Sequence, residues 1–377
     1  MCTWTAPSHC AMTSTPADRI AVIGTGLMGT SIAMAAGRVG CSVTGWDPDP
    51  VATSGAEERT GIRLASSMEA AVVAAEIVVV CAPIPAIPEI VSRVLEAEPA
   101  AVVSDAGSIK EHVVRGVVSL AGAAGAERFI GGHPMGGSER SGPEHASASV
   151  VDGIVWVLTP DEGADPEAVE RLESWIERIG GRPVRMSPER HDRLVAFVSH
   201  LPQVASTALM ALAATEEADE PEILLLAAGG FRDLTRLASS NPALWSQILL
   251  ANREAIAEAI DLYSERLADL RNMVLEGRGD DVEETFDRAK QARLRLTAKP
   301  QVRAGVAVLQ VQVPDRPGAL AELTLVLAEA QVNIEDLQIV HSPEGGRGTV
   351  HLTVAAVSAD DAVAVLGVRA FDPIRLA

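Results

Sequence analysis

The stretch that decides the fold is Ile20-Ala-Val-Ile-Gly-Thr-Gly-Leu-Met-Gly29. Its four apolar residues predict a buried strand, and the glycines that follow mark a tight connection to a helix. In such a unit the first glycine permits the turn, the second lets a pyrophosphate approach the backbone, and the third lets helix and strand pack closely. The stretch therefore predicts a dinucleotide site formed by Gly24, Thr25, Gly26, Leu27, Met28 and Gly29.

Asp47 follows the next predicted strand and supplies the acid that this kind of site uses to bind the adenine-side ribose. Its carboxylate would repel a 2′-phosphate, and Pro48-Asp49-Pro50 offers no arginine to neutralise one. We therefore expect NAD rather than NADP. A glycine turn without a cofactor is the alternative, but the order of strand, glycines, helix, strand and acid favours binding.

Apolar strands alternate with amphipathic or alanine-rich helices from Arg19 to about Ser187. Continuous apolar strands separated by helices are typical of a mostly parallel sheet covered on both faces. We therefore expect an α/β fold in which a flexible leader, 1–18, precedes a Rossmann-type domain, 19–187. The predicted strands are residues 20–23, 42–46, 77–80, 101–104, 129–130, 154–158 and 183–186.

The strand signals stop at Pro188, and the residues that follow predict an all-helical domain over 188–297 for substrate binding and dimerisation. A linker over 298–305 precedes a smaller alternation over 306–377. Its order of strand, helix, strand, strand, helix and strand predicts a ferredoxin-like module. The expected helical stretches of the middle domain are residues 188–215, 219–239, 242–276 and 280–297.

The composition limits the possible partners and compartment. The 377 residues carry a formal net charge of −20, which argues against nucleic acid and anionic membranes as partners. The four cysteines form no CxxC pair and no zinc-like cluster, so we expect a reducing compartment and no metal. The longest charge-free run, Leu194–Thr215, contains polar residues and favours a helix buried at a subunit interface or in a domain core over a membrane span. With no secretory pattern at the N-terminus, the sequence predicts a cytoplasmic protein.

Residues 131–142 read Gly-Gly-His-Pro-Met-Gly-Gly-Ser-Glu-Arg-Ser-Gly, with one histidine among five glycines. Pro134 keeps His133 out of a helix, so the imidazole should lie at a strand end with space in front of it. Histidine is the side chain best suited to proton transfer near neutral pH. A histidine that merely fills a turn is the alternative, but the density of glycines favours a catalytic site.

Two other strand ends should complete the nicotinamide side of the site, because ligands gather beyond the carboxyl ends of strands in open α/β sheets. One is Cys81–Pro85, which contains Pro83, and the other is Ser104–Lys110. Within the second, Ser108 either hydrogen-bonds substrate, cofactor or His133, or caps the following helix.

The helical region contains two further candidate segments. Arg232 and Arg236 lie four residues apart on one predicted helix face, and arginine binds carboxylates through paired hydrogen bonds. Ordinary surface ion pairs are the alternative. The run Ser199-His200-Leu-Pro-Gln203 places polar groups in an apolar helix, where they either face a polar cavity or are hydrogen-bonded for structural reasons.

The motifs GTGLMG, DAGSIK, GGHPMGGSERSG, SHLPQ and GGFRDLTR, in this order over 19–297, resemble the prephenate dehydrogenases of tyrosine biosynthesis. The resemblance implies that His133 hydrogen-bonds the ring hydroxyl of prephenate and takes its proton while hydride passes to NAD. It implies that Ser108 orients the histidine or the hydroxyl, and that Arg236 holds a substrate carboxylate. It also implies a gating acid at Glu139, which pairs with that arginine, and pocket positions at Ser138, Ser199, His200 and Trp245.

One departure from the family pattern concerns the substrate. Gln203 stands where several relatives carry another histidine near the substrate side chain. Prephenate and arogenate differ only there, by a keto group in one and an amino group in the other, so both substrates stay open.

The run Val313–Leu320, with Asn333-Ile334 further on, resembles an ACT domain. ACT modules typically bind amino acids as regulatory ligands. The resemblance therefore implies that tyrosine, or a related amino acid, binds near Gly318 or Asn333 and changes the activity of a homodimeric enzyme. A degenerate module that only assembles dimers is the alternative.

Two other functions compete with this interpretation. A β-hydroxyacid dehydrogenase would share the GxGxMG start and a helical domain, but the chain has no lysine between Lys110 and Lys290 to match that family's catalytic lysine. A non-enzymatic NAD-sensing regulatory protein would explain both ends of the chain but not residues 131–142 or the paired arginines. The sequence therefore favours an NAD-dependent oxidoreductase.

Overall fold

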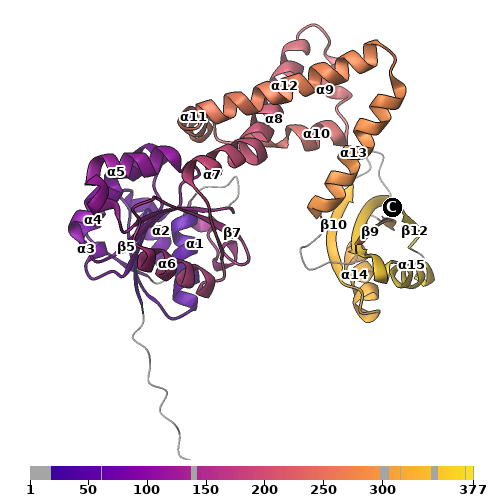
Figure 1. The fold of residues 1–377 in the computed structure, drawn as a ribbon. Coiled ribbons are helices and arrows are strands. Elements are labelled where there is room, and N and C mark those ends of the chain that lie inside the picture. The colour runs from indigo at the N-terminus through magenta and orange to yellow at the C-terminus, as the bar shows by residue number, and fades with distance from the viewer. Residues whose placement is uncertain are drawn as a thin grey trace, which may run out of the picture. The chain divides into compact units, whose positions relative to one another are not determined.

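The computed structural model describes residues 18–60, 62–136, 142–297, 305–314, 316–340, 347–369 and 371–376. Contacts within the chain divide it into two compact units (Figure 1). The first unit consists of Met1–Ala211 and Leu237–Asp261, and the second of Leu212–Arg236 and Leu262–Ala377. The predicted helical domain is thus divided between the two units.

The first unit is built on a sheet with the strand order β3-β2-β1-β4-β5-β6-β7-β8. Neighbouring strands are parallel except β6 and β7, so the mostly parallel Rossmann-type sheet is confirmed. The short edge strand β3 was not predicted, and β6 continues four residues beyond its predicted end. The bounds are β1 Arg19–Ile23, β2 Ser42–Trp46, β3 Arg63–Leu64, β4 Ile77–Val80, β5 Val102–Asp105, β6 Phe129–Pro134, β7 Val155–Pro160 and β8 Arg182–Arg185.

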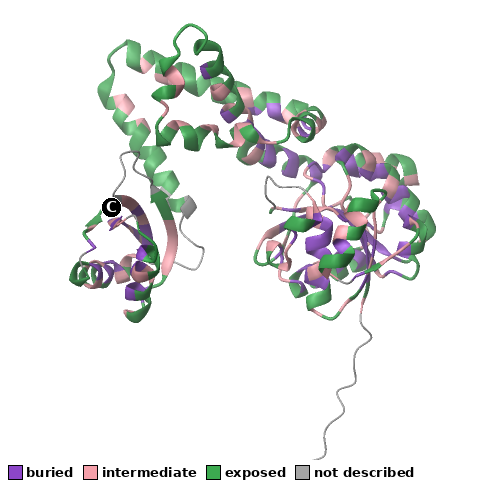
Figure 2. Ribbon diagram, turned by 180° about the vertical axis from the view of Figure 1, so that it is seen from behind, coloured by how far each residue is buried: buried purple, intermediate pink, exposed green. Residues whose placement is uncertain are grey.

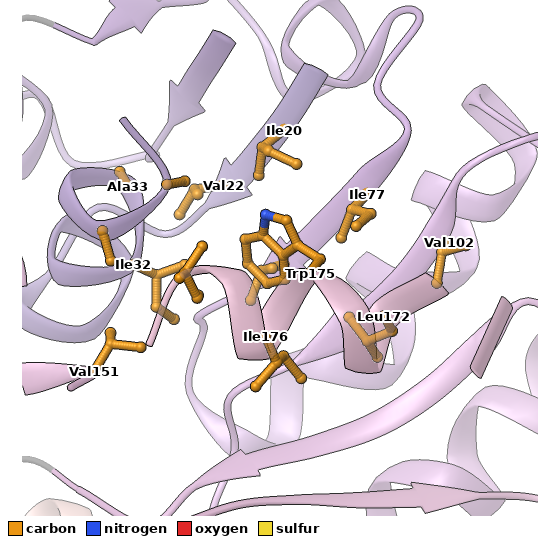
Figure 3. Close-up of a cluster of buried hydrophobic side chains, with 14 of the residues drawn as sticks. Ile20, Val22, Ile32, Ala33, Ile77, Val102, Val151, Leu172, Trp175 and Ile176 are labelled. Carbon is orange, nitrogen blue, oxygen red and sulfur yellow. The ribbon is translucent and has the colours of Figure 1, made fainter. Parts of the chain in front are cut away.

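Helices bury both faces of this sheet, as the continuous apolar strands predicted. In β1, Ile20 and Val22 belong to one buried cluster while Ala21 and Ile23 belong to the other. On the first face, Trp175 of α6 lies among strand residues (Figure 3). The bounds are α1 Leu27–Arg38, α2 Pro50–Thr60, α3 Met68–Val72, α4 Ile87–Ala97, α5 Glu111–Ala126 and α6 Pro166–Arg178.

The middle of the chain is helical, as predicted, but two stretches are interrupted. The predicted helix 219–239 breaks between Leu225 and Gly229, and the predicted helix 242–276 breaks at Asn252. The bounds are α7 Pro188–Val195, a π-helical turn η4 Ala196–His200, α8 Leu201–Glu216, α9 Glu222–Leu225, α10 Gly229–Thr235, a 3₁₀ turn η5 Arg236–Ser239, α11 Pro242–Ala251, α12 Arg253–Leu275 and α13 Gly279–Thr297.

The continuous helical stretch Pro188–Glu216 is long and apolar enough to cross a membrane by length and composition alone. Its sequence predicted a buried helix, yet only 33% of its most apolar window is buried in the single chain. Phe197 and Val198 are among its exposed apolar side chains, and Figure 2 shows that much of the middle helical region is exposed. The predicted burial is therefore met on only part of this helix within one chain.

The C-terminal part of the second unit is a separate small sheet with the order β10-β11-β9-β12, in which neighbouring strands are antiparallel. Residues of β9 alternate between half-buried and buried, and the buried ones pack against α14 and α15. This confirms the predicted ferredoxin-like order. The bounds are β9 Val306–Pro314, α14 Ala319–Glu329, β10 Ile334–Val340, β11 Arg347–Ala355, α15 Ala359–Val368 and β12 Pro373–Arg375.

Candidate active site

The carboxyl ends of five neighbouring strands lie along one edge of the large sheet, because β2, β1, β4, β5 and β6 run parallel. Most of the chemistry-bearing segments predicted from the sequence follow these ends. In the spatial order of the strands they are Asp47, the Gly24 loop, Pro83, Ser108 and His133. From β1 the chain adds β2 and β3 on one side and then β4 and β5 on the other, so the order of the strands changes direction between the neighbours β1 and β4. Dinucleotides bind at this point in this fold.

The glycine loop fits a pyrophosphate. Gly24 has φ +97°, and a Cβ on it would lie 2.1 Å from the Cys81 carbonyl oxygen, while a Cβ on Gly29 would lie 1.8 Å from the Gly24 oxygen. Gly26 has no atom within 4 Å of its Cβ position and caps α1 without a side-chain hydrogen bond. Two glycines therefore permit close packing, and the third leaves the helix N-terminus open to an anion.

Asp47 is fixed beside this loop. Its carboxylate accepts hydrogen bonds from the backbone N–H groups of Thr25, at 2.7 Å, and Asp49, at 2.9 Å. A carboxylate has about four acceptor positions, so two backbone donors leave capacity for ribose hydroxyls. The loop and the acid are thus held together as a single site.

His133 is half-buried in β6, and its Nδ1 lies 2.9 Å from Nε2 of His191. Nδ1 of His191 lies 2.7 Å from Oδ1 of Asp192. The Asp192 carboxylate also accepts from the backbone N–H groups of Lys110, at 2.8 Å, and Glu111, at 2.9 Å. Asp192 on α7 therefore satisfies the N-terminus of α5 and anchors a chain of contacts that ends at His133.

A buried ion pair supports the strand just before His133. The Lys110 ammonium donates to the Asp105 carboxylate and, at 2.7 Å, to the Gly132 carbonyl oxygen. Asp105 in turn accepts from the Gly132 N–H at 3.0 Å. Both side chains are fully buried, so the pair fixes the end of β5 against β6. Sequence reasoning pointed to residues 104–110 but did not identify this pair.

The surroundings of His133 favour its neutral form. Burial, together with the nearby His191, Lys110 and His200 side chains, lowers the pKa of His133 well below its ordinary value. A buried imidazole near a lysine is costly to protonate, since desolvation and like charge both disfavour the cation. His133 is therefore a neutral ring that can accept a proton at neutral pH.

The polar residues of the Ser199–Gln203 segment are engaged within the first unit. Nδ1 of His200 lies 3.3 Å from Asn252 Nδ2, and its ring meets Trp245 edge-on, with centroids 5.9 Å apart. Gln203 donates to the Leu237 carbonyl oxygen at 2.8 Å. Burial lowers the pKa of His200 to about 4. These contacts fit the alternative in which His200 and Gln203 are hydrogen-bonded for structural reasons. Ser199 is half-buried in the π-helical turn, and such turns are frequent at functional sites.

The other predicted residues have different surroundings. Ser108 is half-buried, and α5 begins at Glu111 with Lys110 as its N-cap, so Ser108 does not cap that helix. Ser138 and Glu139 lie outside the described residues. Arg236 belongs to the second unit, where it is exposed at the start of η5.

The two regulatory candidates lie at element ends of the small sheet domain. Gly318 caps α14 with φ +88°, a conformation that favours glycine. Asn333 precedes β10, and its side-chain amide donates to the Glu335 carboxylate at 2.6 Å. Asn333 is exposed, so a ligand can reach it.

His191 and Asp192 are the functional candidates that sequence reasoning missed. The buried residues of α7 are Pro188, His191, Asp192 and Val195, which share one helix face. Burying an imidazole and a carboxylate on the apolar face of an amphipathic helix destabilises the fold unless each group has a partner. Their position on that face, which helical periodicity shows, is the signal in the sequence that could have identified them.

Comparisons with known proteins agree with this arrangement. The family described as "Prephenate dehydrogenase, nucleotide-binding domain" matches residues 32–185, "Prephenate dehydrogenase, dimerization domain" matches 187–288, and "ACT domain" matches 307–369. A prephenate dehydrogenase of Bacillus subtilis (strain 168) is 33% identical over 253 residues, which cover 67% of this chain and 67% of the relative.

Two solved structures extend the comparison. Prephenate dehydrogenase from A. aeolicus, in complex with hydroxyphenyl propionate and NAD+, is 29% identical with a TM-score of 0.70, covering 75% of this chain and 99% of that one. Synechocystis arogenate dehydrogenase is 28% identical with a TM-score of 0.66, covering 74% and 99%. This chain therefore belongs to the prephenate dehydrogenase family.

Proposed function

We propose that the protein is an NAD-dependent prephenate dehydrogenase that converts prephenate to 4-hydroxyphenylpyruvate in tyrosine biosynthesis. The observation that carries this proposal is the half-buried His133 on the same sheet edge as the glycine loop and Asp47, in surroundings that lower the pKa of its ring. The relative from Bacillus subtilis is named for this activity, and the A. aeolicus structure holds NAD+.

The chemistry needs a base and a hydride acceptor. Hydride leaves the ring carbon that carries the hydroxyl group, CO₂ departs, and the ring becomes aromatic. NAD+, when bound, accepts the hydride. Nε2 of His133 takes the hydroxyl proton as the carbonyl develops, because the lowered pKa of His133 leaves this ring uncharged at neutral pH. Lys110 and Asp105 hold the strand end that carries the histidine.

The substrate side is proposed from the family match of individual residues. Arg236 would hold a substrate carboxylate and Glu139 would pair with that arginine, while Ser138, Ser199, His200, Gln203 and Trp245 would line the pocket. Arogenate is the second candidate substrate, because a relative of known structure is an arogenate dehydrogenase and Gln203 replaces a family histidine. Initial rates of NADH formation with prephenate, arogenate and a 3-hydroxyacid decide between these functions. A protein that binds NAD but turns over none of them would be the sensor.

Asp47 should determine the choice of cofactor. The wild-type enzyme is expected to prefer NAD, and Asp47→Ser should raise KM for NAD roughly 10- to 150-fold, since a hydrogen bond to a charged group contributes roughly 1.5–3 kcal/mol. The same variant should use NADP better than the wild type, because the repulsion of a 2′-phosphate is gone. Steady-state kinetics with both cofactors measure this. Asp49→Ser, at the exposed acid two residues on, is the matched control. Equal kcat/KM of the wild-type enzyme for NAD and NADP would contradict the assignment.

We also propose that the protein is a cytoplasmic homodimer assembled through the region that matches the dimerization domain, 187–288. Apolar side chains exposed in the single chain support this, among them Leu225, Leu226 and Leu250.

Tyrosine, or a related amino acid, is the proposed ligand of the ACT domain. Tyrosine should change the rate of the full-length enzyme and raise its melting temperature, because a ligand that binds only the folded state stabilises it. Asn333→Ala should weaken tyrosine binding about tenfold through one lost hydrogen bond, whereas Asn272→Ala, at an exposed asparagine of α12, should not. Thermal shift and initial rates measure both effects. An enzyme that ends at Thr297 and keeps its tyrosine response would refute a sensor in this domain.

A further inference from the structure

We propose that His191, held by Asp192, is a positioning residue that fixes the tautomer of His133, so that Nδ1 carries the proton and Nε2 is the free base. The tautomer of His133 follows from the contacts alone, and only the reaction in which this base takes part rests on the proposed function. It follows from one chain of contacts across α7, β6 and the N-terminus of α5.

The chain begins at a group whose role is unambiguous. An ionised carboxylate only accepts hydrogen bonds, and the Asp192 carboxylate already accepts from two backbone N–H groups at the start of α5. His191 Nδ1, 2.7 Å from Asp192 Oδ1, must therefore be the donor in that contact. In a neutral ring, a proton on Nδ1 leaves Nε2 bare.

The bare nitrogen of His191 determines the state of the next ring. Its Nε2 lies 2.9 Å from His133 Nδ1, and two bare nitrogens at that distance would repel each other. His133 must therefore donate from Nδ1, which leaves its own Nε2 without a proton. The two rings meet edge-on, with centroids 5.1 Å apart and an interplanar angle of 75°, an arrangement that suits an N–H directed at a ring nitrogen.

The groups around His133 disfavour its protonated form. Lys110 and His200 face the pair as positive or potentially positive groups, and Asp105 neutralises Lys110 directly. Burial is the largest cause of the lowered pKa of His133, and His191 is the next. A proton added to His133 would lie near the Lys110 ammonium in a partly buried site, and both the burial and the like charge disfavour it.

This assignment also divides the work between two residues. The family resemblance left Ser108 to orient either the histidine or the substrate hydroxyl. Because Nδ1 of His133 is occupied by His191, we assign the orientation of the ring to His191 and leave the substrate hydroxyl or the cofactor to Ser108.

Three substitutions at one position test the proposal in the full-length enzyme. His191→Phe keeps a ring of similar size but removes both nitrogens, and should lower kcat about 10²-fold, with KM for prephenate nearly unchanged. His191→Gln places an amide oxygen near the position of Nε2 and should recover much of the loss. His191→Asn reaches only Asp192 and should stay low. His112→Gln, at an exposed histidine of α5, should retain wild-type kcat.

A spectroscopic readout separates positioning from a merely structural role. In protein labelled with ¹⁵N at its eight histidines, without substrate, His133 should show a protonated Nδ1 and a bare Nε2. In His191→Phe the tautomer protonated at Nε2 should gain population, and in His191→Gln it should not. Single substitutions assign the signals, and His191→Gln keeps the test available if the Phe variant fails to fold.

The outcomes distinguish this inference from the proposed function. A wild-type His133 with its proton on Nε2, or a folded His191→Phe variant with wild-type kcat, would overturn the positioning role even if prephenate is the substrate. The expected tautomer in a protein that turns over neither prephenate nor arogenate would instead overturn the proposed function and leave the positioning role standing.

Discussion

Replacing His133 with asparagine should lower kcat for prephenate oxidation by roughly 10²–10⁴-fold, the usual cost of removing a general base. Asparagine keeps a polar group of similar size at the end of β6 but accepts no proton at neutral pH. KM should change little, because the lost interaction is made mainly in the transition state. Steady-state kinetics of NADH formation measure both parameters.

The pH dependence of the wild-type enzyme provides an independent check on the same residue. The base works only when deprotonated, so kcat/KM should rise as pH rises through the pKa of His133 and stay level above it. Since burial, His191, Lys110 and His200 hold that pKa well below 6.5, the acidic limb should lie well below pH 6.5. His133→Asn should lose this limb.

A neighbouring histidine supplies the control. His112→Asn changes an exposed imidazole on α5 and should keep both the rate and the acidic limb. Wild-type turnover in His133→Asn would remove the histidine from the mechanism altogether. An acidic limb near the ordinary histidine value would instead mean that another group titrates.

Local patterns explain why so much of the large sheet could be predicted. Ser42–Trp46 and Ile77–Val80 begin and end as expected, because the first is rich in strand-forming residues and ends before Asp47, while the second is an apolar run that follows Glu76. Gly29 was also readable, since a Cβ on it would meet the Gly24 oxygen of the same motif, whereas the close contact at Gly24 comes from the distant Cys81 carbonyl. In these segments, neighbours along the chain carry the information.

The polar network behind His133 was not predictable in the same way. Asp192 contacts backbone groups 81 and 82 residues earlier in the chain, and Lys110 contacts the Gly132 carbonyl across 22 residues. Helical periodicity shows that His191 and Asp192 share a buried face, but not which element lies opposite. Such partners are fixed by tertiary packing of α7 on α5, and no local pattern encodes that packing.

Arg236→Gln should raise KM for prephenate by the equivalent of about 2–5 kcal/mol if bound substrate desolvates the pair between its carboxylate and Arg236, which is exposed in the free chain. That range corresponds to an increase of roughly 30-fold to several thousand-fold, with a smaller effect on kcat. The physical reason is the guanidinium fork, which binds a carboxylate through two parallel hydrogen bonds that a neutral amide cannot replace. The KM of Arg236→Lys should lie between those of the wild-type enzyme and Arg236→Gln, because lysine keeps the charge but loses the fork.

Arg232→Gln is the matched control, because Arg232 lies one helical turn earlier on α10 and is likewise exposed. An ordinary surface arginine contributes at most about 1 kcal/mol, so the control should leave KM close to the wild-type value. An unchanged KM in Arg236→Gln would mean that Arg236, like Arg232, is an ordinary surface arginine that does not bind the substrate. If added salt raises the KM of the wild-type enzyme as much as Arg236→Gln does, the arginine acts through long-range attraction. Salt screens exposed charges much more than it screens a desolvated ion pair. Only a rise in KM that persists at high ionic strength identifies Arg236 as the group that binds the carboxylate directly.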